Sequence, residues 1–171
     1  MTSKQGSYML RILIFGNSGA GKSTLAMEYA AKYSRPHLDL DTLAWEDSNP
    51  PSRKSLKDSA LKIELFTNKN DKWIIEGCYA DLLGLVIENA TEVIFLNPGV
   101  ETCIENCKSR PWEPHKYESI TKQNENLDML LDWVKEYPIR TDEFSLTSHK
   151  KLFNDYVGSK VEYKSNVRNS S

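Results

Sequence analysis

Short apolar runs alternate with amphipathic segments along most of the chain, which has 171 residues. The first run shows little polar alternation, as expected for a strand that is buried on both faces of a parallel sheet. The five runs predicted as strands are Tyr8–Phe15, Pro36–Asp41, Trp73–Gly77, Val93–Leu96 and Lys160–Lys164.

Between these runs, apolar residues recur at the spacing of a helix that buries one face. Strands that alternate with helices imply parallel pairing through right-handed crossovers, so the pattern predicts an α/β fold. The predicted helical stripes are Leu25–Tyr33, Leu56–Phe66, Leu82–Ile87, Val100–Cys107, one long helix from Ile120 to Tyr137, and Phe144–Tyr156.

The segment Gly16–Ser23 has the spacing of a phosphate-binding loop, a glycine followed by four residues and Gly-Lys-Ser. It lies between a predicted strand and a predicted helix, which is the context that this motif requires. Glycines let backbone N–H groups turn towards phosphate oxygens, and the helix adds its positive end. We therefore expect the loop to bind ATP. The predicted contacts are Gly16, Asn17, Ser18, Gly19, Ala20, Gly21, Lys22, Ser23 and Thr24.

Three side chains are predicted to serve a Mg²⁺ ion beside the triphosphate. Ser23 would place its hydroxyl on the ion, next to Lys22 on the β and γ phosphates. Asp39 and Glu76 come at the ends of two predicted strands, where open α/β sheets bind their ligands. Two alternatives stay open: a turn or helix cap at Asp41-Thr42, and a glutamate that faces solvent.

A second acid, Asp41, follows Asp39 at the spacing that puts both side chains on one side of a strand. Either acid would orient the acceptor and take its proton. Arg53 begins a helix that could form a flap, and it is placed to meet an anionic acceptor, although a solvated arginine fits the pattern equally well. Gly77 and Tyr79 complete the predicted acceptor site.

The aromatic and basic segment Arg110–Lys116 is bracketed by prolines and predicts a lid over the phosphates. The alternative is a surface loop in which Trp112 packs. Arg110 at its start and Arg140 behind the lid would stabilise the charge on the transferred phosphoryl group. The predicted catalytic residues are Lys22, Asp39, Asp41, Arg110 and Arg140.

The amino-acid composition and the net charge disfavour some partners and locations for this chain. With a formal net charge of −2 the chain offers no broad basic face, so nucleic acid is not an expected partner. Three cysteines without a Cys-x-x-Cys pair indicate reduced thiols, and Cys103 and Cys107 lie in an apolar stripe that favours core packing over zinc. No apolar run approaches about 18 residues, so no membrane span is predicted. We expect a soluble, cytoplasmic monomer or homodimer.

With these motifs assembled, the chain resembles the nucleoside-monophosphate kinase and shikimate kinase group of phosphate-loop (P-loop) kinases, from about Leu10 to Tyr163. Asp39-Leu40-Asp41 is similar to the Asp-x-Asp of shikimate kinases, in which the first acid serves the magnesium shell and the second the acceptor hydroxyl. Trp73–Gly77 resembles the strand before Asp-Gly-Phe-Pro-Arg in adenylate kinases, with Glu76 in place of the aspartate.

Two further segments carry the resemblance. Phe95–Pro98 with Arg110 is similar to a strand and the lid-entry arginine of this group, and Arg140–Glu143 resembles its Arg-x-Asp-Asp segment after the lid. Within the group, the chain most resembles the small adenylate-kinase-related proteins often called DNA topology modulation proteins.

The resemblance implies a three-layer P-loop NTPase fold with a five-stranded parallel sheet in the order 2-3-1-4-5 and a helical lid. It implies a single kinase domain over residues 1–171, with a core at 8–109 and 138–165, an acceptor-binding flap at about 42–70 and a lid at about 110–137.

The implied activity is magnesium-dependent transfer of the γ-phosphate of ATP to a small-molecule acceptor. Gly77–Ala80 lacks both the Pro-Arg of nucleotide kinases and the Gly-Gly-Gly of shikimate kinases. The acceptor therefore stays open between a shikimate-like or polyol-like hydroxyl and a nucleoside monophosphate. The alternative function is an ATP-binding regulatory or sensing protein without a dedicated acceptor, and a weaker option is an ATPase coupled to nucleic acid.

Overall fold

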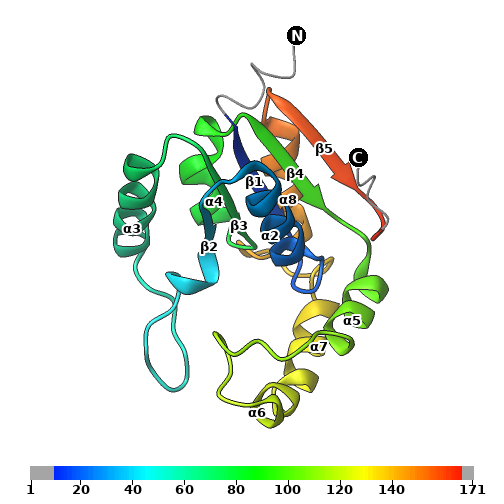
Figure 1. Cartoon of the computed structure of the whole chain (residues 1–171). Coiled ribbons are helices and arrows are strands. Elements are labelled where there is room, and N and C mark those ends of the chain that lie inside the picture. Colours follow the sequence, from blue (N-terminus) through cyan, green and yellow to red (C-terminus); the bar gives the residue numbers. More distant parts are fainter. Residues whose placement is uncertain (1–9, 167–171) are drawn as a thin grey trace.

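The computed structural model describes residues 10–166, and the predicted tails Met1–Ser7 and Val167–Ser171 lie outside these residues. A parallel sheet with the strand order β2-β3-β1-β4-β5 runs through the molecule, with helices on both faces (Figure 1). This arrangement confirms the predicted three-layer P-loop fold. The strands are β1 (Arg11–Gly16), β2 (His37–Asp39), β3 (Trp73–Gly77), β4 (Glu92–Leu96) and β5 (Ser159–Tyr163).

The sheet is apolar on both faces because its strands divide their side chains between two cores. Leu13 and Phe15 of β1 pack in the core beneath α3, α4 and α8, whereas Ile12 and Ile14 pack in the core beneath α2, α5 and α7. The helices are α2 (Lys22–Tyr33), α3 (Leu56–Lys69), α4 (Ala80–Val86), α5 (Val100–Lys108), α6 (Ile120–Glu125), α7 (Leu127–Lys135) and α8 (Leu146–Asp155), with short 3₁₀ turns η1 (Leu40–Thr42) and η2 (Ile87–Asn89). Among the described residues, no helix is long and apolar enough to cross a membrane.

The second strand is shorter than predicted. It ends at Asp39, and the chain turns into η1, where the backbone N–H of Asp41 donates to Asp39 Oδ1 at 2.9 Å. The period-two argument for the two acids is therefore wrong, because Asp41 lies on a turn and not in the strand. The alternative, a turn or cap at Asp41-Thr42, is closer to the structure, but the capping carboxylate is that of Asp39.

The predicted long helix of the lid is two helices. The break is at Asn126, whose side-chain amide donates to the hydroxyl of Tyr117 at 3.1 Å, between α6 and α7. The apolar periodicity continues across Asn126, so the sequence pattern could not reveal the break between the two helices. The next helix, α8, starts only at Leu146, so Arg140 lies in a loop and Phe144 precedes the helix that it was predicted to join.

His149 of α8 is fully buried and joins two elements of the core. Its Nδ1 lies 2.6 Å from the hydroxyl of Tyr137, and its Nε2 lies 2.8 Å from the carbonyl oxygen of Cys78, just beyond β3. The imidazole is neutral in this setting, since burial lowers the pKa of His149 to about 4.

Acid is therefore expected to destabilise the fold through His149. The unfolded chain takes up a proton near pH 6.5 and the folded chain only near pH 4, so this stabilisation is complete above pH 6.5 and is lost as the pH falls towards 4. The loss is about 3 kcal/mol. Urea unfolding between pH 4 and 8 measures it, and His149→Gln should flatten the curve. Asp39, with its pKa raised to about 6, acts in the opposite direction, so the comparison between the two proteins isolates His149. Exposed His115→Gln is the control, and an unchanged slope in His149→Gln would contradict this account.

Candidate active site

A cavity of about 670 Å³ lies at the carboxyl ends of β1, β2 and β3, between the glycine-rich loop and the segment that was predicted to be a lid. This is the edge at which a parallel sheet of this kind binds ligands. Its lining includes the loop and α2 residues Ser18, Gly19, Gly21, Lys22, Ser23, Thr24 and Met27, the strand-end residues His37, Asp39, Asp41, Glu76 and Cys78, and lid residues from Ser109 to Tyr117.

The loop is held in a conformation that only glycine adopts without strain. Gly21, with φ at 93°, is the N-cap of α2, and Gly19 has φ at 79°. A Cβ on Gly19 would lie 2.5 Å from the carbonyl oxygen of Cys103, so α5 packs directly against the loop. The ammonium of Lys22 donates to the carbonyl oxygen of Asn17 at 2.7 Å and thus folds back over the loop.

Gly19→Ala is expected to distort the loop, because the new methyl group meets Cys103 O and Cys107 Sγ, the latter at 2.6 Å, in a backbone region that disfavours side chains. We expect a loss of about 1–3 kcal/mol of stability and a weakened affinity for ATP. Gly84→Ala in α4 is the matched control, since nothing lies within 4 Å of its added Cβ, and it should stabilise the helix by about 0.5–1 kcal/mol. Thermal unfolding and ATP titration of both variants check this prediction; equal effects would contradict it.

Acids from two neighbouring strands meet the loop. Asp39 and Glu76 are register partners at the ends of β2 and β3, and the hydroxyl of Ser23 donates to Glu76 Oε1 at 3.0 Å. Glu76 is buried, and His37 Nε2 lies 3.4 Å from the same oxygen. Burial raises the pKa of Asp39 to about 6, and the nearby carboxylates of Glu76 and Asp41 add to this shift. Hydroxyl and carboxylate oxygens thus gather beside the loop.

Asp41 is bound from two directions. It accepts a hydrogen bond from the hydroxyl of Tyr79, which in turn accepts one from Trp45 Nε1 at 2.8 Å. From the lid, Lys116 Nζ donates to Asp41 Oδ2 at 2.9 Å and lies 3.8 Å from Asp39 Oδ2. Burial opposes the ionisation of Asp41, but Lys116 and Tyr79 outweigh it and lower the pKa of this carboxyl.

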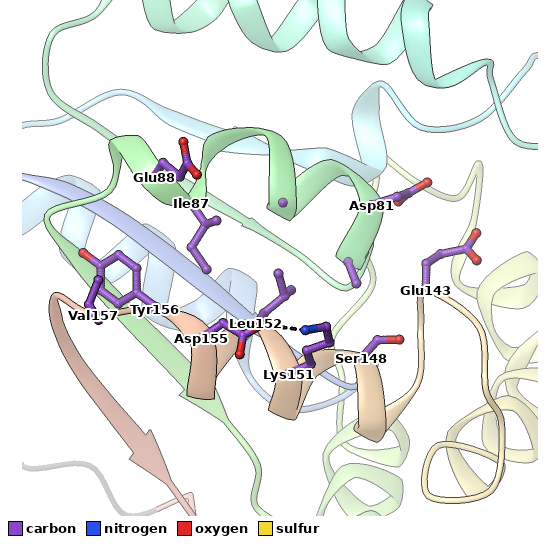
Figure 2. Close-up of a pocket in the computed structure, with 12 residues that line it drawn as sticks. Asp81, Ile87, Glu88, Glu143, Ser148, Lys151, Leu152, Asp155, Tyr156 and Val157 are labelled. Atoms are coloured by element: carbon purple, nitrogen blue, oxygen red, sulfur yellow. Dashed lines mark hydrogen bonds and ion pairs between the residues drawn. The ribbon is translucent and has the colours of Figure 1, made fainter.

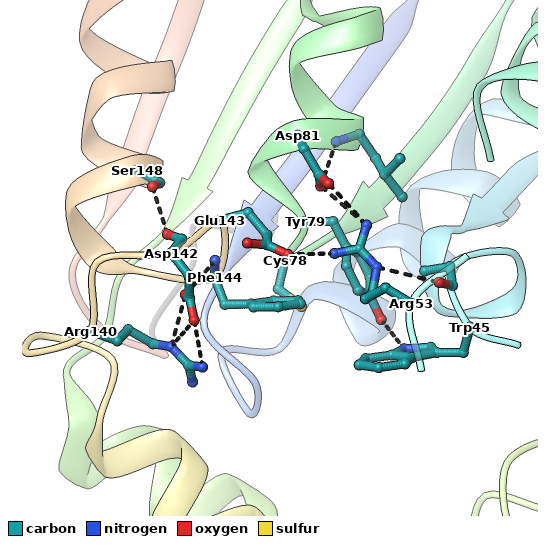
Figure 3. A network of polar contacts seen from close by, with 12 residues as sticks. Trp45, Arg53, Cys78, Tyr79, Asp81, Arg140, Asp142, Glu143, Phe144 and Ser148 are labelled. Carbon is teal, nitrogen blue, oxygen red and sulfur yellow. Dashed lines mark hydrogen bonds and ion pairs between the residues drawn. The ribbon is translucent and has the colours of Figure 1, made fainter. Parts of the chain in front are cut away.

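Two of the predicted arginines do not line this cavity. Figure 3 shows both bound to carboxylates. Arg53 lies between Glu143, at 2.8 Å, and Asp81, at 3.1 Å. Its guanidinium also lies 4.8 Å from the ring centroid of Tyr79, so it links the residues just before α3 to α4 and to the loop before α8. Arg140 binds Asp142 at 2.8 Å.

Arg110, in contrast, lines the cavity, where its guanidinium lies 3.5 Å from Glu113. Gly77 is not in the lining and packs against Leu40, whose Cβ would lie 2.9 Å from an added Cβ. Tyr79 is likewise absent from the lining but reaches Asp41 from behind. Gly16, Asn17 and Ala20 belong to the loop, where they are buried. The functional roles of all these residues stay predictions.

Sequence reasoning missed three residues that shape the site: Lys116, Trp45 and His37. Lys116 belongs to the basic segment predicted as a lid, but nothing local marks it as the partner of Asp41. Trp45 belongs to no sequence motif, and its role depends on a contact with Tyr79, 34 positions away.

A second cavity, of about 690 Å³, lies between α4 and α8 (Figure 2). It is lined by residues such as Ile87, Leu152 and Tyr156, with Glu88 and Asp155 beside them. None of the predicted phosphate contacts lines it. The chemistry is therefore expected in the cavity beside the loop.

Comparisons with known proteins give similarity to solved structures only. No model of a protein family matches the chain, and no curated protein matches it. Shikimate kinase from Acinetobacter baumannii in complex with shikimate is 17% identical, with 88% of this chain and 92% of that chain covered and a TM-score of 0.46. Deoxyadenosine kinase from M. mycoides with bound dATP is 15% identical, with 93% of each chain covered and a TM-score of 0.49. A gluconokinase from Sinorhizobium meliloti is 16% identical, with 85% and 94% covered and a TM-score of 0.47. These values assign no family, so the function is argued from the site itself.

Proposed function

We propose that this protein is a magnesium-dependent kinase that transfers the γ-phosphate of ATP to a small-molecule acceptor. The observation that carries the proposal is one cavity in which Lys22 and Ser23 of a glycine-rich loop meet the acids Asp39, Asp41 and Glu76. Phosphoryl transfer needs positioning and charge neutralisation more than covalent help, and these residue types supply both.

The residues fit a Mg²⁺ ion beside a triphosphate. Ser23 Oγ and Glu76 Oε1 lie 3.0 Å apart at the loop, with Asp39 on the neighbouring strand. Mg²⁺ keeps several waters and is usually bound through one or two carboxylates plus the substrate phosphates. It therefore does not need a cluster of three His, Cys, Asp or Glu ligands, of which the described residues hold none. When bound, the ion would neutralise charge on the β and γ phosphates.

The remaining groups would hold the two substrates and move one proton. Lys22, released from the Asn17 carbonyl, would bind phosphate oxygens, and Arg110 would approach them from the lid. The acceptor oxygen forms a bond to the γ-phosphorus, the bond to the β,γ-bridging oxygen breaks, and ADP leaves with that electron pair. Asp41 would orient the acceptor hydroxyl and receive its proton. The lid would exclude water, which would otherwise hydrolyse ATP.

An ADP-release screen tests this proposal. Purified protein with Mg²⁺ and ATP is assayed with acceptors that carry hydroxyl groups, including polyols, sugars and nucleoside monophosphates, against a control without acceptor. The proposal expects at least one acceptor to raise the rate clearly above the control. If ATP binds and no acceptor raises the rate, the sensing function without a dedicated acceptor is the better account.

A further inference from the structure

We infer that the acceptor of this kinase carries no negative charge, and that the preferred acceptors bear an ammonium group near the hydroxyl that is phosphorylated. Amino alcohols and amino sugars have this chemistry. The inference rests on the proposed function and adds the substrate class to it.

An anionic acceptor would need cationic side chains, and Arg53 and Arg140 already bind carboxylates. Arg53, the cation closest to the predicted flap, is already bound by two carboxylates, Asp81 and Glu143 (Figure 3), and does not line the cavity. Arg140 is bound by Asp142 and stacks on the ring of Trp133, 3.3 Å from its centroid. An acceptor carboxylate or phosphate would have to break one of these partly buried ion pairs, and separating such a pair is costly.

The charged side chains that line the cavity also disfavour a negative acceptor. Its charged lining residues are the acids Asp39, Asp41, Glu76 and Glu113 and the bases Lys22, Arg110 and Lys116. Lys22 belongs to the phosphate loop and Arg110 lies beside Glu113. Asp39 and Glu76 are assigned to Mg²⁺ under the proposed function, so the acceptor side is left with Asp41 and Lys116, which bind each other. A negative acceptor would have to lie beside the carboxylate of Asp41 or separate it from Lys116, and like charges a few ångströms apart destabilise each other.

The carboxylates of Asp39 and Asp41, called the acid pair here, already hold an ammonium group. Lys116 Nζ lies 2.9 Å from Asp41 Oδ2 and 3.8 Å from Asp39 Oδ2. A primary ammonium group thus fits between these carboxylates with the hydroxyl of Tyr79 bound to the other oxygen of Asp41. Because Lys116 lies on a turn and not on the sheet, we expect an acceptor ammonium to be able to take its place.

Aromatic side chains complete a surface suited to a cation. Trp112 and Tyr117 line the same cavity from the lid, and the side chain of Trp112 is 44% exposed. The faces of such rings attract cations and give nothing comparable to an anion. The acid pair, the lysine bound to it and the aromatic side chains of the lining all favour a positively charged acceptor.

The test compares polyhydroxylated acceptors of similar size that differ in charge. One set is glucosamine, glucose and gluconate, and the other is an aminocyclitol, inositol and shikimate. ADP release with Mg²⁺ and ATP gives kcat/KM for each compound. We expect the ammonium member of a set to exceed its neutral member about ten- to a hundredfold, the range of one charge-assisted hydrogen bond, and the carboxylate member to stay at the control rate.

A variant of the lysine supplies a second readout. Lys116→Ala removes the internal competitor, so KM for glucosamine or the aminocyclitol should fall about two- to tenfold, while the carboxylates stay at the control rate. The matched control is Lys122→Ala, a lid lysine that is 63% exposed and lies 3.9 Å from Glu125, and it should change neither value. If Lys116 instead binds an anionic acceptor, Lys116→Ala abolishes turnover of a carboxylate, which overturns the inference.

The outcomes separate this inference from the proposed function. A preference for gluconate or shikimate over the amino compounds overturns the inference and leaves a kinase. If Mg²⁺-ATP binds in calorimetry and no member of either set is phosphorylated, the inference is overturned, and the wider acceptor screen of the proposed function decides separately whether the protein is a kinase. The order ammonium, neutral, carboxylate supports both.

Discussion

Lys22→Ala is expected to slow ADP formation about a hundred- to a thousandfold, which corresponds to the loss of about 3–4 kcal/mol of transition-state stabilisation. The reason is that Lys22 is the cation of the loop, and its ammonium donates to the carbonyl oxygen of Asn17 within that loop. Because this bond lies within the loop and Lys22 belongs to neither core of the described residues, the fold should survive. Steady-state kinetics with the best acceptor and a thermal melt measure the two properties separately.

The control for this variant is Lys57→Ala, which removes an exposed lysine of α3 far from the loop in sequence and outside the lining of the cavity. It should leave turnover unchanged. Unchanged turnover in Lys22→Ala would remove this lysine from the mechanism, and a large drop in its melting temperature would show that the lost activity reports unfolding.

Asp41→Asn is expected to lower the acceptor-dependent rate about 10²–10⁴-fold while the affinity for Mg²⁺-ATP is unchanged. The amide keeps the size of Asp41 but cannot receive the acceptor proton, and it weakens the bond to Lys116. Asp39→Asn should behave differently, since Asp39 lies beside Glu76 and is assigned to Mg²⁺. It should raise the Mg²⁺ concentration needed for half-maximal rate.

Initial rates at varied acceptor and varied Mg²⁺ distinguish these two acids, and Asp132→Asn is the control because its side chain is 78% exposed on α7. If Asp41→Asn changes only the Mg²⁺ requirement and Asp39→Asn only the acceptor-dependent rate, the two roles are reversed. If neither variant changes the kinetics, the acids do not belong to the reaction.

Much of the fold could be predicted because local pattern and global order agree. The strands that carry Ile12–Phe15 and Ile74–Ile75 are apolar on both faces, which requires helices on both sides of the sheet. The phosphate loop could be placed for a similar reason, since its motif needs a strand before it and a helix after it. Asp39 and Glu76 meet near the loop because parallel strands end at one edge of the sheet.

What could not be predicted depends mainly on contacts between residues that lie far apart in the sequence. Arg53 is a suitable residue to bind an anion, but it forms ion pairs with Asp81 and Glu143. Neither acid is near Arg53 in the sequence. Lys116 reaches Asp41 across 75 positions, and no periodicity links them. The break at Asn126 was hidden because α6 and α7 continue one apolar pattern across it. Side-chain pairing over long sequence separation thus decided the parts of the site that sequence patterns left open.

The central claim is that the loop and the strand-end acids together bind a triphosphate with its metal. Isothermal titration calorimetry of ATP into the purified protein, with Mg²⁺ and then with EDTA, tests this most directly. The account predicts uptake of one nucleotide per chain that weakens strongly without Mg²⁺ and in Lys22→Ala. No heat of binding, or an affinity that is the same with Mg²⁺, with EDTA and in Lys22→Ala, would contradict it.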